Sequence, residues 1–123
     1  MIGWWIVIAQ ETPDERDANL DKKIGVIASW ECSVNGTKWL CDMAAHGKAT
    51  QLRTGGYPTR YVALARDVLP LIANGTPKHD GITIVGDDYV IPGDWCGNVT
   101  LHHEKIANCP PEQILTIDAW DLD

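Results

Sequence analysis

An Asn35-Gly36 pair stands at the centre of residues 28–43, ASWECSVNGTKWLCDM, and is the strongest local constraint on the fold of this chain. Both residues tolerate the positive φ angles that a type I′ turn requires, so the pair favours a two-residue hairpin loop. Apolar and polar residues also alternate on either side of it. We therefore expect a β-hairpin whose strands cover 24–34 and 37–45.

This register sets each cysteine of the stretch against a tryptophan, with Cys32 opposite Trp39 and Cys41 opposite Trp30. The two cysteines are then diagonal neighbours, about 7–8 Å apart at Cα. A disulfide requires about 4.4–6.8 Å between the Cα atoms, so these thiols are not expected to join. We expect both to be buried, reduced and free of metal, packed as small hydrophobic side chains.

Hydrophobic patterning predicts one helix and several strands in the remainder of the chain. Ile2–Gln10 is apolar on both faces and predicts a central strand, and the polar segment 11–23 after it is expected to be a loop. The helix is expected to begin at Pro58 and Thr59, with an apolar stripe at Tyr61, Leu64, Ala65, Val68 and Ile72. Further strands are expected at 49–53, 82–85, 89–91, 99–103 and 114–119.

This order of elements predicts a single α+β domain over residues 1–123, a mainly antiparallel sheet with one principal helix packed on it. The chain is 45% hydrophobic and 22% charged, which is typical of soluble globular proteins. It is also rich in tryptophan, with six tryptophans and no phenylalanine. The apolar N-terminus lacks the basic residues of a secretory signal. A cytoplasmic location with reduced cysteines is therefore expected.

Two cysteines and two histidines form a possible metal-binding array, Cys96-x5-His102-His103-x5-Cys109. The array lacks the closely spaced ligand pairs that usually hold a structural zinc. Adjacent histidines on the strand predicted there would also point to opposite faces of a sheet. We therefore expect no metal at this array.

Other catalytic motifs are weak or missing. Gly86-Asp87-Asp88 resembles a paired carboxylate motif, but Gly and Asp between two apolar runs are typical of a turn. The chain has no nucleophile elbow and no phosphate-binding loop around Gly55-Gly56. No catalytic residue or cofactor is expected.

The charge is distributed unevenly along the chain. Residues 1–75 hold eight Lys/Arg and eight Asp/Glu, whereas 76–123 hold two lysines and nine acidic residues. The whole net charge of −7 therefore belongs to the second part. An acidic surface disfavours direct nucleic-acid binding, which needs cations to neutralise phosphates. It is suited to a basic protein surface.

We therefore expect a small acidic, non-catalytic binding protein, an inhibitor or adaptor that occupies a basic surface of a nucleic-acid-binding protein. Short acidic chains of this type occur among phage and mobile-element proteins that act against host defence, such as anti-CRISPR proteins. No membrane contact is expected. The expected partner-binding residues are Asp87, Asp88, Asp94, Asp118, Trp120, Asp121 and Asp123.

Two alternatives remain open at this point. One is a small phage-type structural or accessory subunit, which would assemble at high copy number. The other is a metal-dependent enzyme that uses Cys96, His102, His103 and Cys109.

Overall fold

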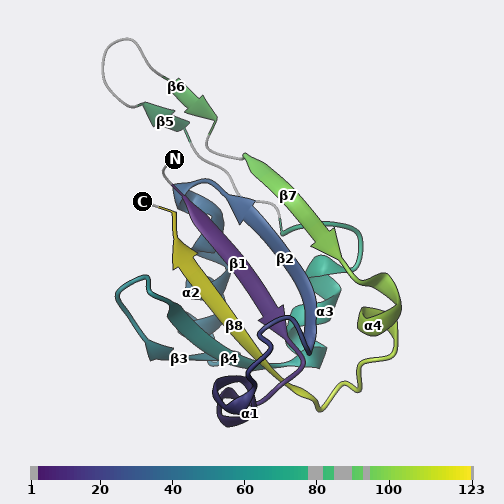
Figure 1. Ribbon diagram of the computed structural model, residues 1–123. Coiled ribbons are helices and arrows are strands. Elements are labelled where there is room, and N and C mark those ends of the chain that lie inside the picture. Colours follow the sequence, from purple (N-terminus) through teal and green to yellow (C-terminus); the bar gives the residue numbers. More distant parts are fainter. Residues whose placement is uncertain (1–2, 78–81, 85–89, 93–94, 123) are drawn as a thin grey trace.

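A computed structural model describes residues 3–77, 82–84, 90–92 and 95–122. Its main feature is a six-stranded antiparallel sheet with the strand order β3-β4-β8-β1-β2-β7 (Figure 1). The six strands are β1 (Trp4–Ala9), β2 (Val26–Cys32), β3 (Ala49–Arg53), β4 (Thr59–Leu64), β7 (Cys96–Leu101) and β8 (Ile114–Asp121). A separate two-stranded ribbon pairs β5 (Ile82–Ile84) with β6 (Val90–Pro92).

The described part of the chain also contains four α-helices and one short 3-10 helix. They are α1 (Pro13–Ala18), η1 (Val34–Thr37), α2 (Lys38–Ala45), α3 (Ala65–Ile72) and α4 (His103–Ala107). The predicted α+β class with a mainly antiparallel sheet is confirmed. The sequence pattern had indicated only one of these helices. No described helix is both long enough and apolar enough to cross a membrane.

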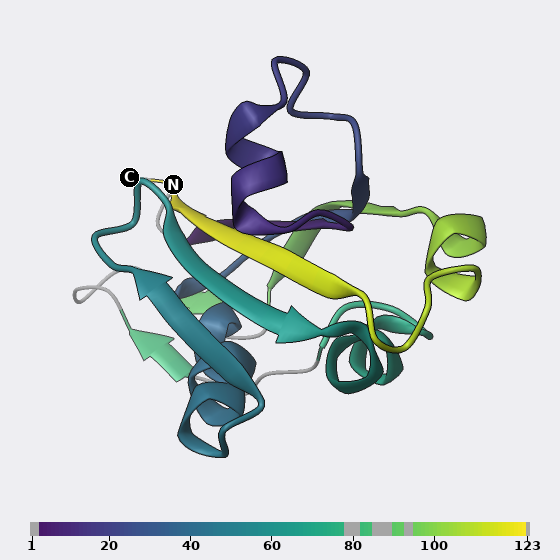
Figure 2. The same ribbon diagram turned by 90° about the horizontal axis from the view of Figure 1, so that it is seen from below.

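One face of the sheet carries the hydrophobic core. Along β1 the side chains alternate, and Ile6 and Ile8 are fully buried on this face. Helices α2 and α3 cover the same face, and Leu40, Val68 and Ile72 complete the core from them (Figure 2). The expected central position of the first strand is confirmed, because β1 lies between β8 and β2.

Helix α1 lies over the opposite face, which we call the outer face (Figure 2). The expected loop at 11–23 contains this helix because Thr12 and Glu15 form a capping box. The Thr12 hydroxyl accepts from the Glu15 N–H at 3.2 Å, and the Glu15 carboxylate accepts from the Thr12 N–H at 2.9 Å. Pro13 occupies the first helical position, where its missing N–H costs nothing.

The predicted hairpin at Asn35-Gly36 is wrong. The Gly36 N–H donates to the Ser33 carbonyl at 2.9 Å, and the chain continues through η1 directly into α2. Helical spacing lets Trp39, Leu40 and Met43 all reach the core. Strand β2 finds its partners elsewhere, in β1 and β7, so tertiary pairing overrides the local turn preference.

The predicted helix start at Pro58 is also wrong. Residues Thr59–Leu64 form strand β4, which pairs with β3 and β8, and the helix begins only at Ala65. The stripe residues Ala65, Val68 and Ile72 are fully buried as predicted. Tyr61 is buried too, but from the strand. The apolar residues of the strand and of the helix that follows it happen to recur at helical spacing, so the pattern predicted one continuous helix.

The remaining strand predictions are close to the structure. The strand at 49–53 is confirmed, and 114–119 lies within β8, which continues to Asp121. The strand expected at 99–103 begins earlier, at Cys96, and ends at Leu101. The runs at 82–85 and 89–91 overlap β5 and β6.

Candidate functional site

A cavity of about 850 Å³ opens on the outer face of the sheet, beside α1 and the segment that follows it. We call it the sheet-face cavity. Its floor is a row of side chains in register across all six strands, from β3 at one edge to β7 at the other. The row is Arg53, Arg60, Asp118, Val7, Ser29 and Thr100.

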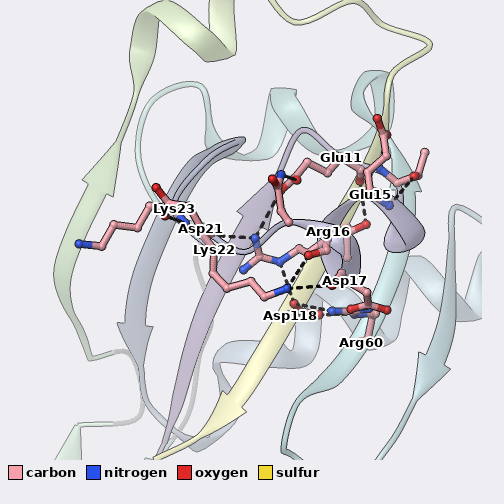
Figure 3. Close-up of polar contacts among 12 residues, drawn as sticks. Glu11, Glu15, Arg16, Asp17, Asp21, Lys22, Lys23, Arg60 and Asp118 are labelled. Carbon is pink, nitrogen blue, oxygen red and sulfur yellow. Dashed lines mark hydrogen bonds and ion pairs between the residues drawn. The ribbon is translucent and has the colours of Figure 1, made fainter.

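Asp118 lies at the centre of this floor and is 1% exposed. Arg60 binds it in a bidentate manner, with Nε donating to Oδ1 at 2.7 Å and Nη2 donating to Oδ2 at 3.1 Å. Arg16 approaches from α1, and its Nε donates to Oδ2 at 3.1 Å. One buried carboxylate therefore joins two guanidinium groups from distant parts of the chain (Figure 3).

Further contacts fix both arginines in place. Arg16 Nη1 also donates to the Lys22 carbonyl at 3.1 Å and to Glu11 Oε1 at 3.4 Å. Arg60 Nη1 donates to Asp17 Oδ1 at 2.8 Å. The network holds α1 against the sheet and preorganises the floor of the cavity (Figure 3).

The ion pairs shift the ionisation of the groups involved. The hydrogen bond from Arg60 lowers the pKa of the Asp17 carboxyl below its ordinary value of 3.8. The hydrogen bond to Asp118 raises the pKa of the Arg60 guanidinium. Both groups therefore stay charged at neutral pH.

The lining carries a surplus of positive charge, although the chain as a whole is acidic. Its acidic members are Asp17 and Asp118, against six cationic side chains, so four positive charges are in excess when His102 is counted as neutral. Among the described residues, Lys23 and Lys105 have no acidic side chain within ion-pair distance. The cationic members are Arg16, Lys22, Lys23, Arg53, Arg60 and Lys105.

Aromatic side chains form one end of the cavity. Trp5 on β1 lies directly opposite Trp120 on β8, and both belong to the lining together with Tyr57 and Pro58. Trp5 is 42% exposed and Tyr57 is 68% exposed. Large aromatic surfaces left open to solvent inside a concave site are typical of ligand binding.

Within the described residues, the three members of the predicted partner-binding set do not form an exposed acidic surface. Asp118 is buried within its ion pairs, which corrects the expectation that it belongs to an exposed face. Trp120 is half-buried in the cavity wall, and Asp121 is half-buried at the end of β8. Asp87, Asp88, Asp94 and Asp123 lie outside the described residues.

The possible metal-binding array does not come together as a ligand set. Cys96 begins β7, His102 and His103 lie at the start of α4, and Cys109 follows that helix. The histidines do not share a strand, which corrects that expectation. Within the described residues, no three His, Cys, Asp or Glu side chains are grouped so that they could hold a metal ion.

The cysteines of the expected hairpin are in different surroundings. Cys32 is fully buried as predicted, and burial raises its pKa to about 12. Cys41 is exposed on α2, so the expectation that it is buried is wrong. The neighbours of Cys32 across the sheet are Trp4 on β1 and Cys96 on β7, in place of the predicted Trp39.

Sequence reasoning missed most of the cavity, because its residues come from eight separate elements and the segments between them. Arg16 and Lys22 fall in residues 11–23, which hold five acidic and three basic residues, and Lys105 falls in the strongly acidic part of the chain. Local charge therefore gave no sign of a cationic site. Asp118 and Trp120 had been predicted to bind a partner, and both line the cavity, but no sequence signal connected them with Trp5 or with the cationic residues.

Comparison with known proteins adds no assignment: no family model, no curated protein and no solved structure matches the chain.

Proposed function

We propose that this chain is a non-catalytic binding protein that holds an anionic ligand in the sheet-face cavity. The observation that carries the proposal is the excess of four positive charges in the lining of a cavity whose chain has a net charge of −7. Such a local field attracts an anion to one place, while the rest of the surface repels it. The cavity volume lies within the range of about 300–1,000 Å³ that is typical of small-molecule sites.

The state of the two carboxylates in the lining supports binding in preference to acid–base catalysis. Asp17 and Asp118 both accept hydrogen bonds from Arg60, and the pKa of Asp17 is lowered. A general base works best with a pKa near the working pH, so Asp17, whose pKa is lowered, is a weak one. Asp118 is 1% exposed and already accepts hydrogen bonds from Arg16 and Arg60. These groups are suited to holding the arginines in position.

Titration with inorganic triphosphate at constant ionic strength, followed by calorimetry, tests the proposal. The double variant Lys23→Gln/Lys105→Gln removes two cations of the lining and should weaken binding at least tenfold, which corresponds to about 1.4 kcal/mol. Lys48→Gln makes the same type of change at an exposed position outside the cavity and should alter affinity less than twofold. Equal affinities of the double variant and the Lys48 control, or no binding to the native protein, would remove the proposal.

A second candidate function rests on the separate observation that residues 76–123 carry the entire net charge. We propose there an inhibitor or adaptor whose acidic side chains contact a basic protein partner, as phage proteins acting on nucleic-acid-binding complexes do. Trp120 would supply an aromatic anchor, and the carboxylates would accelerate encounter.

The test of this second candidate must leave Asp118 unchanged, because neutralising it breaks a buried ion-pair network. Asp87, Asp88, Asp94 and Asp123 are replaced together by Asn, and capture of the native partner is compared with that of the unchanged protein. At low salt the variant should capture less of the partner than the unchanged protein does. Adding an anion that binds the sheet-face cavity should not restore capture. Undiminished capture would contradict this second candidate and would leave solubility as the role of the acidic residues.

A further inference from the structure

The aromatic end of the sheet-face cavity is suited to a planar ring. Trp5 and Trp120 are cross-strand neighbours on the outer face, and Tyr57 lies at the same end of the lining. Trp5 keeps 42% of its surface exposed, so its indole is accessible to a ligand. A nucleobase can stack on such an aromatic side chain.

Two lysines of the lining, Lys23 and Lys105, come from segments next to β2 and β7, the strands at the other end of the floor row. Lys22 and Lys23 belong to the segment between α1 and β2, and Lys105 belongs to α4, which follows β7. Lys22 Nζ donates a hydrogen bond to the Arg16 carbonyl at 2.6 Å. Lys23 points away from the ion-pair network (Figure 3), and its ammonium group is thus separate from the contacts that hold α1.

The two ends are separated by a distance that suits an elongated ligand. The spacing between neighbouring strands is about 4.8 Å, so the three steps from β8 through β1 and β2 to β7 cover roughly 14 Å. A ligand that uses both ends therefore needs a flat ring, a linker and a multiply charged anionic group. A nucleoside with two or more phosphates has this arrangement.

The polar groups between the two ends also fit a sugar. Ser29 and Thr100 are neighbours in the floor row, on β2 and β7, and both line the cavity. Their hydroxyls can donate and accept hydrogen bonds. They lie between the aromatic end and Lys105 in the strand order.

We infer that the anionic ligand of the sheet-face cavity is a free nucleotide with at least two phosphates. The base lies against Trp5 and Trp120, and the phosphates lie towards Lys23 and Lys105. This inference rests on the proposed function and narrows it to one chemical class. A free nucleotide is favoured over a nucleic-acid strand because α1 and its following segment stand over the outer face and interrupt a continuous path across the sheet (Figure 2).

The experiment titrates the protein with ATP, GTP, CTP and UTP separately, and with inorganic triphosphate, adenosine and an eight-residue oligothymidylate, by calorimetry. At least one nucleoside triphosphate should bind ten or more times more tightly than inorganic triphosphate. The affinity of that nucleotide should also be at least tenfold higher than the affinities of adenosine and of the oligonucleotide.

Variants separate the two ends of the cavity. Trp5→Ala should weaken the best nucleotide at least tenfold and leave inorganic triphosphate within twofold. Lys23→Gln/Lys105→Gln should weaken both ligands. Trp95→Ala removes a tryptophan outside the lining and should change neither affinity. Thermal unfolding without ligand checks that each variant is folded, and Trp5→Leu replaces Trp5→Ala if the smaller side chain lowers stability.

The outcomes distinguish this inference from the proposed function. If inorganic triphosphate binds as tightly as every nucleotide and Trp5→Ala has no effect, the nucleotide is rejected and the anion site stands. If the oligonucleotide binds more tightly than all four nucleotides, the inference of a free nucleotide is rejected and the ligand is a nucleic-acid strand. If none of the phosphate compounds binds, both the inference and the proposed function fail.

Discussion

At the scale of single residues, the most consequential group is a buried carboxylate in a chain whose acidic side chains were expected to be on the surface. Asp118 is held by Arg16 and Arg60 on the outer face of the sheet. A buried ion pair often adds little to stability compared with apolar residues of the same size, but removing one partner leaves an uncompensated charge. Here the removal of one carboxylate would leave two guanidinium groups without their shared partner.

Asp118→Asn tests this arrangement. We expect the free energy of unfolding at pH 7 to fall by about 3–5 kcal/mol, the usual loss when one partner of a buried pair is removed. Asp42→Asn breaks the exposed pair with Lys38 on α2 and should cost less than about 1 kcal/mol. Urea denaturation measures both. A loss for Asp118→Asn no larger than that of the control would show that the network contributes little.

The cysteines provide a second test at this scale. Cys41 is exposed and should react first with iodoacetamide at pH 8. Cys32 should stay unmodified until the protein unfolds, because it is fully buried and its pKa is raised to about 12. Peptide mapping by mass spectrometry identifies the modified thiols, and Cys41→Ser should remove the fastest phase. Early labelling of Cys32 would contradict the position of β2 inside the sheet.

At the scale of elements, α1 is a six-residue helix that depends on the sheet for its position. A helix of this length is not stable alone in water. Its capping box fixes the first turn, and Arg16 and Asp17 attach it to Asp118 and Arg60. The contacts that shape one wall of the cavity are therefore the contacts that hold the helix.

The pH dependence of stability reports the attachment through Asp17. Its folded-state pKa is lowered from 3.8, so its pair with Arg60 contributes stability above that value, and the contribution is lost as the pH falls through the lower folded pKa. Asp17→Asn should therefore reduce stability at pH 7, and the difference from the native protein should disappear in acid. Thermal unfolding of both proteins from pH 7 to pH 2 measures it. A difference that persists at pH 2 would assign the effect to another cause.

At the scale of the whole molecule, the strands nearest the two ends of the described chain lie side by side in the middle of the sheet. Strand β1 pairs with β8 over six residues, and β8 also pairs with β4. Most of the sheet therefore depends on contacts between residues about 50 or more positions apart. Such non-local pairing makes folding slow and cooperative.

A chain that ends at Gln113 tests this dependence. It lacks β8 and with it the fully buried Leu115 and Ile117, each of which contributes about 1.5–3 kcal/mol through burial. Together with the lost ladders on both sides, this approaches the total stability of about 5–15 kcal/mol of a small domain. We expect no cooperative urea transition in circular dichroism. A native-like transition would show that the other five strands fold alone.

The amino-acid sequence by itself determined the α+β class, the buried first strand and the positions of most strands, because apolar periodicity depends only on neighbours along the chain. It also determined that Cys32, Val68 and Ile72 are core residues. It failed at Asn35-Gly36 and at Pro58, where local turn and helix preferences are worth little compared with the pairing of whole strands.

Only the tertiary structure decided where the charges act. The sequence located the net charge of −7 in residues 76–123, but net charge does not describe the field at one point. Sheet pairing places Arg60 beside Asp118 and Trp5 beside Trp120, although these pairs are 58 and 115 positions apart in the chain. A cationic cavity in an acidic protein is produced by such long-range register, and register depends on which strands meet.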